Sequence, residues 1–314
     1  MILRKPDFYD QFRCISSHCT DTCCIGWEID VDETSLERYH RVDGDFGDKL
    51  CANIEDGHFK LLPHDRCPFL DKSNLCEIYK NLGEGALCDI CREHPRFVEV
   101  YGDIMERGLG LCCEEATRLL LAGNGPLTFV SEECDEPEDE LSEDDIEFRD
   151  EVLDVRDSYF KILTNTTKSF DNKLYEVFGY TSEKPFYPFD SASEMYSVMR
   201  KTESYGPAWD KALDRIKVRI DAGGIQDEGF FSENERSRLL TYLIYRHYAK
   251  SLFEGREQGK LLFALFFWNI ARFFTCELAG TTNAHSVKIN AVKILSKQFE
   301  YSEENMEQLE SILD

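Results

Sequence analysis

Residues 12–28 read FRCISSHCTDTCCIGWE and place Cys14, Cys19, Cys23 and Cys24 in one short stretch. Thiols so close in sequence converge without the ordering of a long loop, and more distant ligands join them at an entropic cost that rises slowly with loop length. Cysteine-rich loops with little regular structure need a cross-link, which a bound metal supplies. The stretch therefore predicts an N-terminal region that folds around its cysteines.

The start of the chain bears on the chemistry of these thiols. It reads MILRKPDFYDQF and turns polar after three residues, so we expect no secretory signal and a cytoplasmic location. Disulfides are rare in a reducing cytoplasm, where clustered cysteines more often bind metal or carry out redox chemistry.

Further cysteines follow in small groups. They are Cys51, Cys67 in RCPFLD, Cys76 in LCEIY, Cys88 and Cys91 in LCDICREHPR, the adjacent Cys112 and Cys113, and then Cys134 and Cys276. Thiolates hold zinc in tetrahedral sites and iron in clusters. Zinc fingers usually show two matched pairs, whereas here Cys88-x-x-Cys91 is the one clean pair, so the spacing leaves zinc and iron–sulfur both open. We expect the side chains of Cys23 and Cys24 to diverge, and Cys51, Cys134 and Cys276 to be buried free cysteines.

The formal net charge of −25 limits the partners of the chain. A field of that sign repels phosphate backbones, so we expect no nucleic acid. It suits a basic partner or substrate, or it serves solubility alone. The apolar segment 260–280, KLLFALFFWNIARFFTCELAG, is interrupted by Asn269, Arg272 and Glu277, and its unbroken run is shorter than the ~20 residues a bilayer needs. We expect a buried helix there and no membrane partner.

Composition and periodicity predict a mainly α fold with a small cysteine-rich metal-binding α+β region followed by an all-helical region. The predicted domains are a cysteine-rich, metal-binding domain at 1–125, an acidic linker or loop at 126–147 and a helical domain at 148–314. The linker contains SEECDEPEDELSEDDIE, which has one sign of charge and few apolar residues.

Apolar residues at spacings of three and four predict the helices. Residues 146–165 place Phe148, Val152, Val155, Tyr159 and Leu163 on one face. Further helices are predicted at 207–220 with Pro207 in the first turn, from a capping box of Ser232 and Glu235, and at 260–279, 286–299 and 303–313. In the N-terminal region, short helices are predicted at 34–42 and 46–54, a strand at 58–62, a hairpin at 96–111 around Gly102, and a helix that ends at Gly123.

Four segments carry a resemblance to a known family. FRCISSHCTDTCCIGWEIDVDE, CPFLD, LCEIYKNLGEGALCDICREHPR and ERGLGLCCEEATRLLL, in this order, resemble the flagellin lysine-N-methylase (FliB-type) family and its YkgJ-type zinc- or iron-chelating cysteine domain. The resemblance covers about residues 8–122. It implies a cytoplasmic protein-lysine N-methyltransferase of the bacterial flagellum that methylates flagellin lysines, with S-adenosyl-L-methionine as donor and an iron–sulfur (4Fe-4S) cluster, zinc being the alternative metal.

The resemblance also implies metal ligands. The family's cysteines fall on Cys14, Cys19, Cys23, Cys24, Cys67, Cys76, Cys91 and Cys113. Cys88 and Cys112 stand where the family commonly has other residues, so no ligand role is carried over to them. His94 stands where the family tends to have tyrosine, which leaves it available as a ligand or proton carrier. The implied cysteines exceed the four that one cluster uses, so some are structural or a second metal is bound.

Methyl transfer to lysine requires a neutral amine, whose ordinary pKa is ~10.4 and falls on burial. A carboxylate or phenol orients that amine, and aromatic faces suit the sulfonium and the methylated product. Trp27, Tyr79, Tyr101 and Glu106, in or beside the motifs, are the catalytic candidates, although each also has a plain structural interpretation. The donor site is not placed, because neither G-x-G-x-x-G after a strand nor a C-x-x-x-C-x-x-C motif occurs.

Two other classes stay open. One is a metal-chelating or metal-delivery module without methyltransferase activity. The other is a thiol-redox protein built on Cys88-Asp-Ile-Cys91, for which the following REHPR is a poor fit. The long helical half favours the methylase, because chelation alone would not need it.

Overall fold

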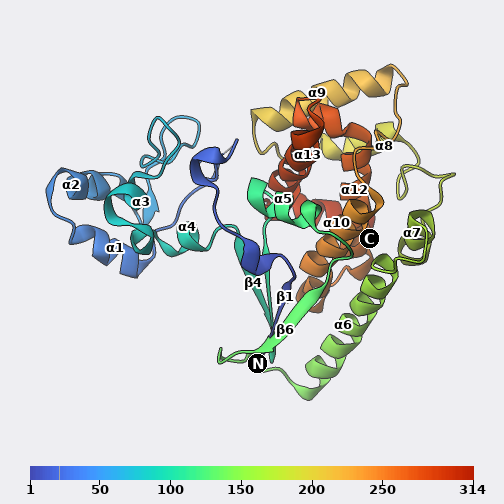
Figure 1. The fold of residues 1–314 in the computed structure, drawn as a ribbon, viewed down its shortest axis with the longest axis horizontal. Coiled ribbons are helices and arrows are strands. Elements are labelled where there is room, and N and C mark those ends of the chain that lie inside the picture. Colours follow the sequence, from blue (N-terminus) through green and yellow to red (C-terminus); the bar gives the residue numbers. More distant parts are fainter. Residues whose placement is uncertain (21) are drawn as a thin grey trace. The chain divides into compact units, whose positions relative to one another are not determined.

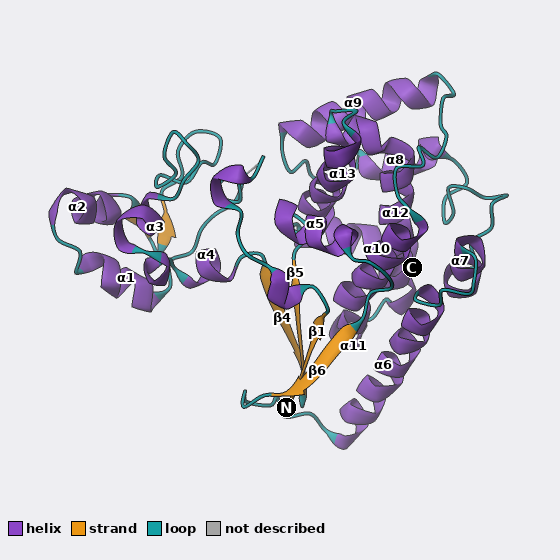
Figure 2. Cartoon of the chain, viewed as in Figure 1, coloured by secondary structure: helices purple, strands orange, loops and turns teal. Residues whose placement is uncertain are grey.

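The computed structural model describes residues 1–20 and 22–314, and helices dominate it (Figures 1 and 2). The helices are α1 Glu33–His40, α2 Gly44–Ala52, α3 Glu77–Leu82, α4 Asp89–Glu93, α5 Glu114–Ala122, α6 Glu143–Leu163, α7 Phe170–Phe178, α8 Ala192–Met199, α9 Pro207–Asp221, α10 Glu233–His247, α11 Ser251–Glu254, α12 Glu257–Ala279, α13 Ala284–Phe299 and α14 Glu303–Leu313. The strands are β1 Ile2–Pro6, β2 Ile54–Glu55, β3 His58–Phe59, β4 Arg96–Tyr101, β5 Ile104–Leu109 and β6 Phe129–Glu133. The predicted mainly α class is confirmed.

Two compact units interleave along the sequence. The first, here called the helical unit, comprises Met1–Phe12, Val98–Cys112 and Ala116–Asp314. The second, the cysteine unit, comprises Arg13–Phe97 and Cys113–Glu115. The cysteine unit is therefore an insertion into the chain of the helical unit. The predicted domains were instead consecutive segments, and their boundaries stay a prediction.

Helix α12 forms the core of the helical unit. Its residues from Leu261 to Trp268 are all buried, and it contacts α9, α10, α13 and α14. A helix that is apolar all round belongs in a core or a membrane, and by length and composition α12 could cross one. Most of its apolar length is buried in the helical unit. The predicted buried helix is confirmed.

Two buried polar side chains of α12 donate hydrogen bonds inside the unit. Asn269 donates a hydrogen bond to the carbonyl of Tyr187 at 2.8 Å. Arg272 donates to the hydroxyl of Tyr180 at 2.9 Å and to the carbonyl of Pro185 at 2.7 Å. Burial of these groups is tolerated because they are hydrogen-bonded.

The predicted helix starts are confirmed where caps define them. Ser232 and Glu235 form the predicted capping box at the start of α10. Pro207 begins α9 as predicted, and Trp209 in its first turn is buried.

The buried face of α6 carries different residues from those predicted. Val152 and Leu163 are buried as expected, but Phe148 and Val155 are 43% and 42% exposed. The inward face instead carries two arginines with carboxylate partners on the β4–β5 hairpin, which apolar spacing does not reveal. They are Arg149, paired with Asp103, and Arg156, paired with Glu106.

A four-stranded sheet in the order β4-β5-β1-β6 packs beside these helices. The hairpin of β4 and β5 confirms the prediction for 96–111, and Gly102 occupies its turn with φ +71°. β1 pairs in parallel with β5 and antiparallel with β6. β6 lies within the segment predicted as a linker or loop. The charged residues of β6 do not follow the apolar pattern that predicts a strand. Its partner β1 lies more than a hundred residues earlier in the sequence.

Hydrogen bonds from two buried tyrosines join this sheet to α10. The Tyr245 hydroxyl bonds to the carbonyls of Arg4 at 2.9 Å and Arg107 at 3.0 Å, which joins β1 to β5. The Tyr242 hydroxyl donates to the Leu109 carbonyl at 2.7 Å. The helical unit is thus held together by buried tyrosines as well as by apolar packing.

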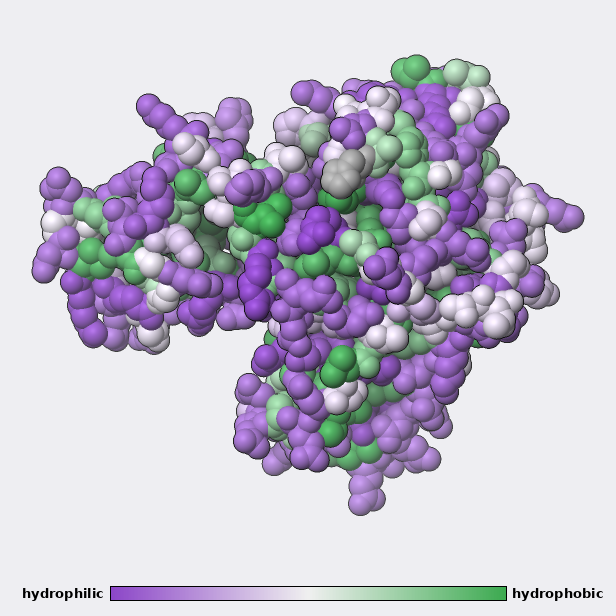
Figure 3. Space-filling view, viewed as in Figure 1, coloured by the Kyte–Doolittle hydropathy of each residue, from purple (hydrophilic) through white to green (hydrophobic). Residues whose placement is uncertain are grey.

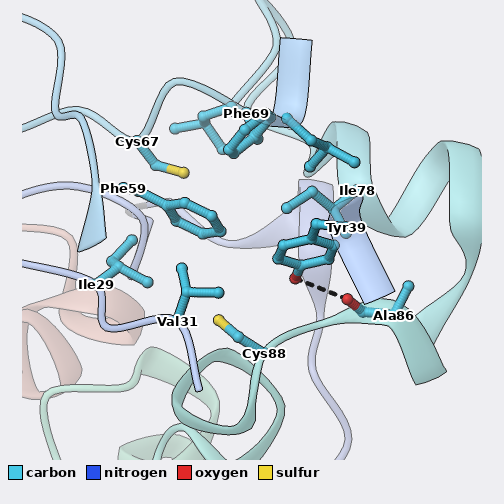
Figure 4. Close-up of a cluster of buried hydrophobic side chains, with 11 residues drawn as sticks. Ile29, Val31, Tyr39, Phe59, Cys67, Phe69, Ile78, Ala86 and Cys88 are labelled. Carbon is cyan, nitrogen blue, oxygen red and sulfur yellow. Dashed lines mark hydrogen bonds between the residues drawn. The ribbon is translucent and has the colours of Figure 1, made fainter. Parts of the chain in front are cut away.

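The cysteine unit has a small core of eleven buried residues, most of which Figure 4 labels. α1 and α2 confirm the predicted short helices, and the predicted strand begins as β3, which pairs with β2. The Tyr39 hydroxyl donates to the Ala86 carbonyl at 2.8 Å across this core. A core of so few apolar residues stabilises a unit of this size only weakly. A metal cross-link would therefore add substantially to its stability.

Candidate metal centre

Five cysteines gather at the core of the cysteine unit. Cys67 and Cys88 are part of the core, and their sulfur atoms lie among its apolar side chains (Figure 4). Cys24, Cys76 and Cys91 pack against it. We call these five the inner thiols.

The backbone positions three of these sulfurs. Cys76 and Cys88 are the N-cap residues of α3 and α4, and N–H groups in the first turn of each helix act on the sulfur so as to lower the pKa of the thiol. The N–H of Phe69 donates to the sulfur of Cys67. Hydrogen bonds of this kind favour the thiolate, which is the form that binds metal.

Backbone contacts also join the segments that carry the inner thiols. The Cys67 N–H donates to the Cys24 carbonyl at 2.9 Å, and Leu70 forms an isolated antiparallel bridge with Cys76. One carboxylate oxygen of Asp32 caps α1, and the other accepts the N–H of Asp89 at 2.8 Å, at the start of α4. Four separate stretches of sequence are thereby held beside one core.

The adjacent Cys23 and Cys24 act on each other. A hydrogen bond from the Cys23 thiol lowers the pKa of Cys24 to about 7, with help from Thr22 and the Arg66 guanidinium and against the effect of burial. The same contact, together with burial, raises the pKa of Cys23. The expectation that these side chains diverge is therefore wrong, because the two thiols are close enough to shift each other's pKa.

A second pair behaves in the same way. The Cys91 thiol lowers the pKa of Cys88, and the contact raises the pKa of Cys91. Burial raises the pKa of Cys67 to about 12, and the charges of other inner thiols add to that shift. Burial also raises the pKa of Tyr39, with contributions from Cys88, Cys91 and Cys76. These mutual effects place the inner thiols in one electrostatic neighbourhood.

Cys14, Cys19, Cys23 and Cys113 form a second group, here called the outer thiols. Negative charge on Cys113 or Cys14 raises the pKa of Cys23, so these three lie near one another. The Cys19 thiol donates to Glu114 at 3.6 Å, beside Cys113. Cys14 and Cys23 are exposed, and the other two are half-buried.

The predicted ligands therefore divide between the two groups. The inner group holds Cys24, Cys67, Cys76 and Cys91, and it also holds Cys88, to which the resemblance assigned no role. The Cys88-x-x-Cys91 spacing alone could have indicated that residue.

The remaining cysteines lie elsewhere. Cys112 belongs to the helical unit and bonds to Tyr301. Cys51 is exposed, and Cys134 and Cys276 are half-buried, so the expectation that these three are buried is wrong. Cys51 lies near the end of α2, Cys134 directly follows β6, and Cys276 lies in the last turn of α12.

The donor set fits a thiolate-bound metal. Within residues 1–20 and 22–314, no three His, Cys, Asp or Glu side chains meet closely enough to hold an ion. The inner thiols nevertheless supply several soft ligands, N–H donors to sulfur and apolar surroundings, which are the features of zinc–thiolate and iron–sulfur sites.

The four catalytic candidates divide between the two units. Trp27 and Tyr79 belong to the cysteine unit, where Trp27 bonds to the Cys23 carbonyl and Tyr79 is 52% exposed. Tyr101 and Glu106 belong to the helical unit and are buried.

Three of the candidates make further contacts within their own units. The Trp27 ring lies 5.6 Å from the ring of His94, the residue that departs from the family pattern. The Tyr101 ring stacks on Phe253 at 5.8 Å. Glu106 accepts two hydrogen bonds from Arg156.

Comparisons with known proteins place these cysteines in a family. The CxxCxxCC model, described as a zinc- or iron-chelating domain, matches residues 13–108. A lysine-N-methylase of Salmonella typhimurium strain LT2 is 31% identical over 131 residues, covering 37% of this chain and 32% of that protein. The flagellar biosynthetic protein FliU of Salmonella muenchen is 30% identical over 131 residues, covering 37% of this chain and 75% of that protein. The chain belongs to the FliB-type lysine-N-methylase family.

The coverage differs between these relatives. This FliB-type chain spans about a third of the length of the curated lysine-N-methylases that it matches, including one from Salmonella choleraesuis strain SC-B67. No solved structure matches the chain. The matched domain begins at Arg13, where the cysteine unit also begins, and this agreement supports metal binding by that unit.

Proposed function

We propose that this FliB-type protein is a cytoplasmic protein-lysine N-methyltransferase that uses S-adenosylmethionine to methylate flagellin and holds a metal in its cysteine unit. The observation that carries the proposal is the likeness to lysine-N-methylases and to FliU over the cysteine segments, which fold into one unit with grouped thiols. The methyl donor and flagellin come from the resemblance.

The inner thiols are the proposed ligands of a 4Fe-4S cluster, with zinc as the alternative metal. Bound there, the metal would cross-link loops that the small core stabilises only weakly. The outer thiols, Cys14, Cys19, Cys23 and Cys113, are the candidates for a second ion. Cys23 lies in contact with both groups through Cys24.

In the proposed reaction, the lysine ε-ammonium first loses a proton. The amine nitrogen then forms a bond to the methyl carbon while the bond from that carbon to the sulfonium sulfur breaks, which leaves a neutral thioether. The acidic chain attracts protonated lysines, and the face in Figure 3 is predominantly hydrophilic. Neutralising the amine requires its removal from water, which lowers its pKa.

Two assays test this function separately. Protein purified without oxygen is expected to contain iron and sulfide, and Cys88→Ser is expected to lose metal and stability, since metal binding is coupled to folding. Cys51→Ser is the matched control, because its exposed thiol lies outside both groups. Equal metal loss in both variants would contradict the assignment of the inner thiols, and a protein with zinc alone would reject the cluster.

Methyl transfer is read from the intact mass of flagellin incubated with donor and metal-replete protein. Mass increases of one methyl group on lysine peptides are expected. If the protein binds metal but neither methylates flagellin nor binds the donor in calorimetry, it is a metal-chelating or metal-delivery module. That second candidate is favoured by the confinement of the similarity to 37% of the chain.

A further inference from the structure

A pocket of about 300 Å³ in the helical unit has an aromatic lining that comes from distant parts of the sequence. Its volume is at the low end of the range of about 300–1,000 Å³ for ligand sites. Tyr159 comes from α6, Phe178 from α7, and Tyr187 from the loop that follows α7. Tyr248 belongs to a 3-10 turn after α10, and Glu257 is in the first turn of α12.

Two of the tyrosines form perpendicular walls. The rings of Tyr159 and Tyr248 lie at 90° with their centroids 5.5 Å apart, and the nearby phenol of Tyr159 contributes to the raised pKa of Tyr248. Tyr248 is buried, and this burial raises its pKa, so the phenol stays neutral at physiological pH. Two electron-rich rings held at a right angle make a concave surface.

The charge of the lining is negative. Glu257 contributes a carboxylate, and no Lys, Arg or His is among the described residues that line the pocket. Leu261 and Leu262 complete an apolar floor. A pocket with these properties attracts a cation. Its acceptors are the Glu257 carboxylate, the Gln258 amide and the phenols, so any preference for a methylated cation over a primary ammonium depends on the aromatic faces.

Methylated onium ions match this lining. Their charge is spread over methyl groups that donate no strong hydrogen bonds, and aromatic faces within about 6 Å of the cation attract them. We propose that the pocket formed by Tyr159, Phe178, Tyr187, Tyr248 and Glu257 binds a methylated onium group, either a methylated ammonium or a sulfonium. This binding does not depend on methyl transfer by the protein.

The first test compares a cation with its neutral isostere. Choline and 3,3-dimethylbutan-1-ol have the same shape and differ in charge, so ligand-observed NMR titrations of the whole protein separate cation recognition from simple apolar burial. Choline is expected to bind about 2- to 30-fold more tightly, which is the range for a cation–π contact. Equal affinities, or no binding of choline, would overturn the proposal.

Variants locate the binding in this pocket. Tyr159→Leu removes one wall and is expected to weaken choline binding by a similar factor, whereas Tyr159→Phe keeps the ring and much of the affinity. Tyr175→Leu is the matched control, because Tyr175 is a 62% exposed tyrosine on α7 outside the lining. Melting curves confirm that each variant is folded. A loss of affinity in Tyr175→Leu as large as in Tyr159→Leu rejects the site.

Two further pairs of probes distinguish the sources of the onium group. S-adenosylmethionine carries a sulfonium and S-adenosylhomocysteine a neutral thioether, while Nε-trimethyllysine and lysine differ by three methyl groups. A preference for the charged or methylated member that Tyr159→Leu abolishes identifies the donor or the methylated side chain as the natural occupant. If neither pair shows a preference, the pocket does not recognise the methylated onium group and the proposal fails.

Discussion

Replacing Glu106 by glutamine is expected to destabilise the helical unit severely. The Glu106 carboxylate accepts hydrogen bonds of 2.7 and 2.6 Å from the two terminal nitrogens of Arg156. The side chains of Glu106 and Arg156 are 2% and 0% exposed. The second cation near this carboxylate is Arg4, at 4.0 Å. Glutamine keeps the volume but removes the charge, so the guanidinium of Arg156 stays buried beside a neutral amide.

The expected magnitude follows from that burial. Removing one partner of a buried ion pair costs about 3–5 kcal/mol in the free energy of unfolding. For a unit of 150–250 residues, each kcal/mol shifts Tm by about 2–4 °C, so Tm is expected to fall by roughly 6–20 °C. Urea and thermal unfolding followed by far-ultraviolet circular dichroism measure both quantities.

Two further variants control this experiment. Glu99→Gln breaks a partly exposed pair with Lys250, which has a separation of 2.8 Å, and is expected to cost less than about 1 kcal/mol. Replacing Glu106 by leucine and Arg156 by methionine together removes both charges, and it is expected to recover most of the loss. The structural role of Glu106 is refuted if Glu106→Gln unfolds like the wild type but no longer supports methyl transfer, which would make this residue catalytic.

Two other predictions concern stability. Burial lowers the pKa of His247 to about 4, although Glu300 at 2.8 Å opposes this shift. The unfolded chain takes up this proton near pH 6.5 and the folded chain only near pH 4, so the free energy of unfolding is expected to fall by up to about 3 kcal/mol as pH drops through that window. His247→Gln should flatten this slope in urea titrations, and an unchanged slope would contradict the assignment. In Gly259→Ala, the new Cβ would lie 2.5 Å from a backbone oxygen of α14, so a loss of about 1–3 kcal/mol is expected, whereas Gly224→Ala meets no atom within 4 Å and should be neutral or slightly stabilising. Equal stability of these two alanine variants would show that α12 and α14 are less closely packed than described.

Much of the helical unit could be predicted because local signals determine it. The all-apolar run of α12, the first-turn Pro207 of α9 and the Ser232 capping box each specify an element without reference to the rest of the chain. β1 and β6 escaped prediction because their pairing depends on partners about a hundred residues away. The buried face of α6 was not predicted for a related reason. Burial of Arg156 depends on its ion pair with Glu106, which is distant in sequence.

The candidate sites show the same division. The spacing of Cys88 and Cys91 was visible in the sequence, but the division of the thiols into two groups depends on how α3 and α4 are placed. The aromatic pocket had no sequence signal, because Tyr159, Tyr187 and Tyr248 come from three separate segments. Sequence spacing can predict a site whose residues come from one segment. A site whose residues come from several segments can be found only from the three-dimensional structure.

The parallel pairing of β1 with β5 affects how the protein folds during its synthesis on the ribosome. Ile2 pairs with Ile104, and all of Arg13–Phe97 is synthesised between them. At about 5–20 residues per second, β1 waits roughly 5–20 s for its partner. Every inner thiol has been made by then, so we expect the cysteine unit to capture its metal before the sheet forms. Scarcity of that metal during translation would then limit how many chains mature.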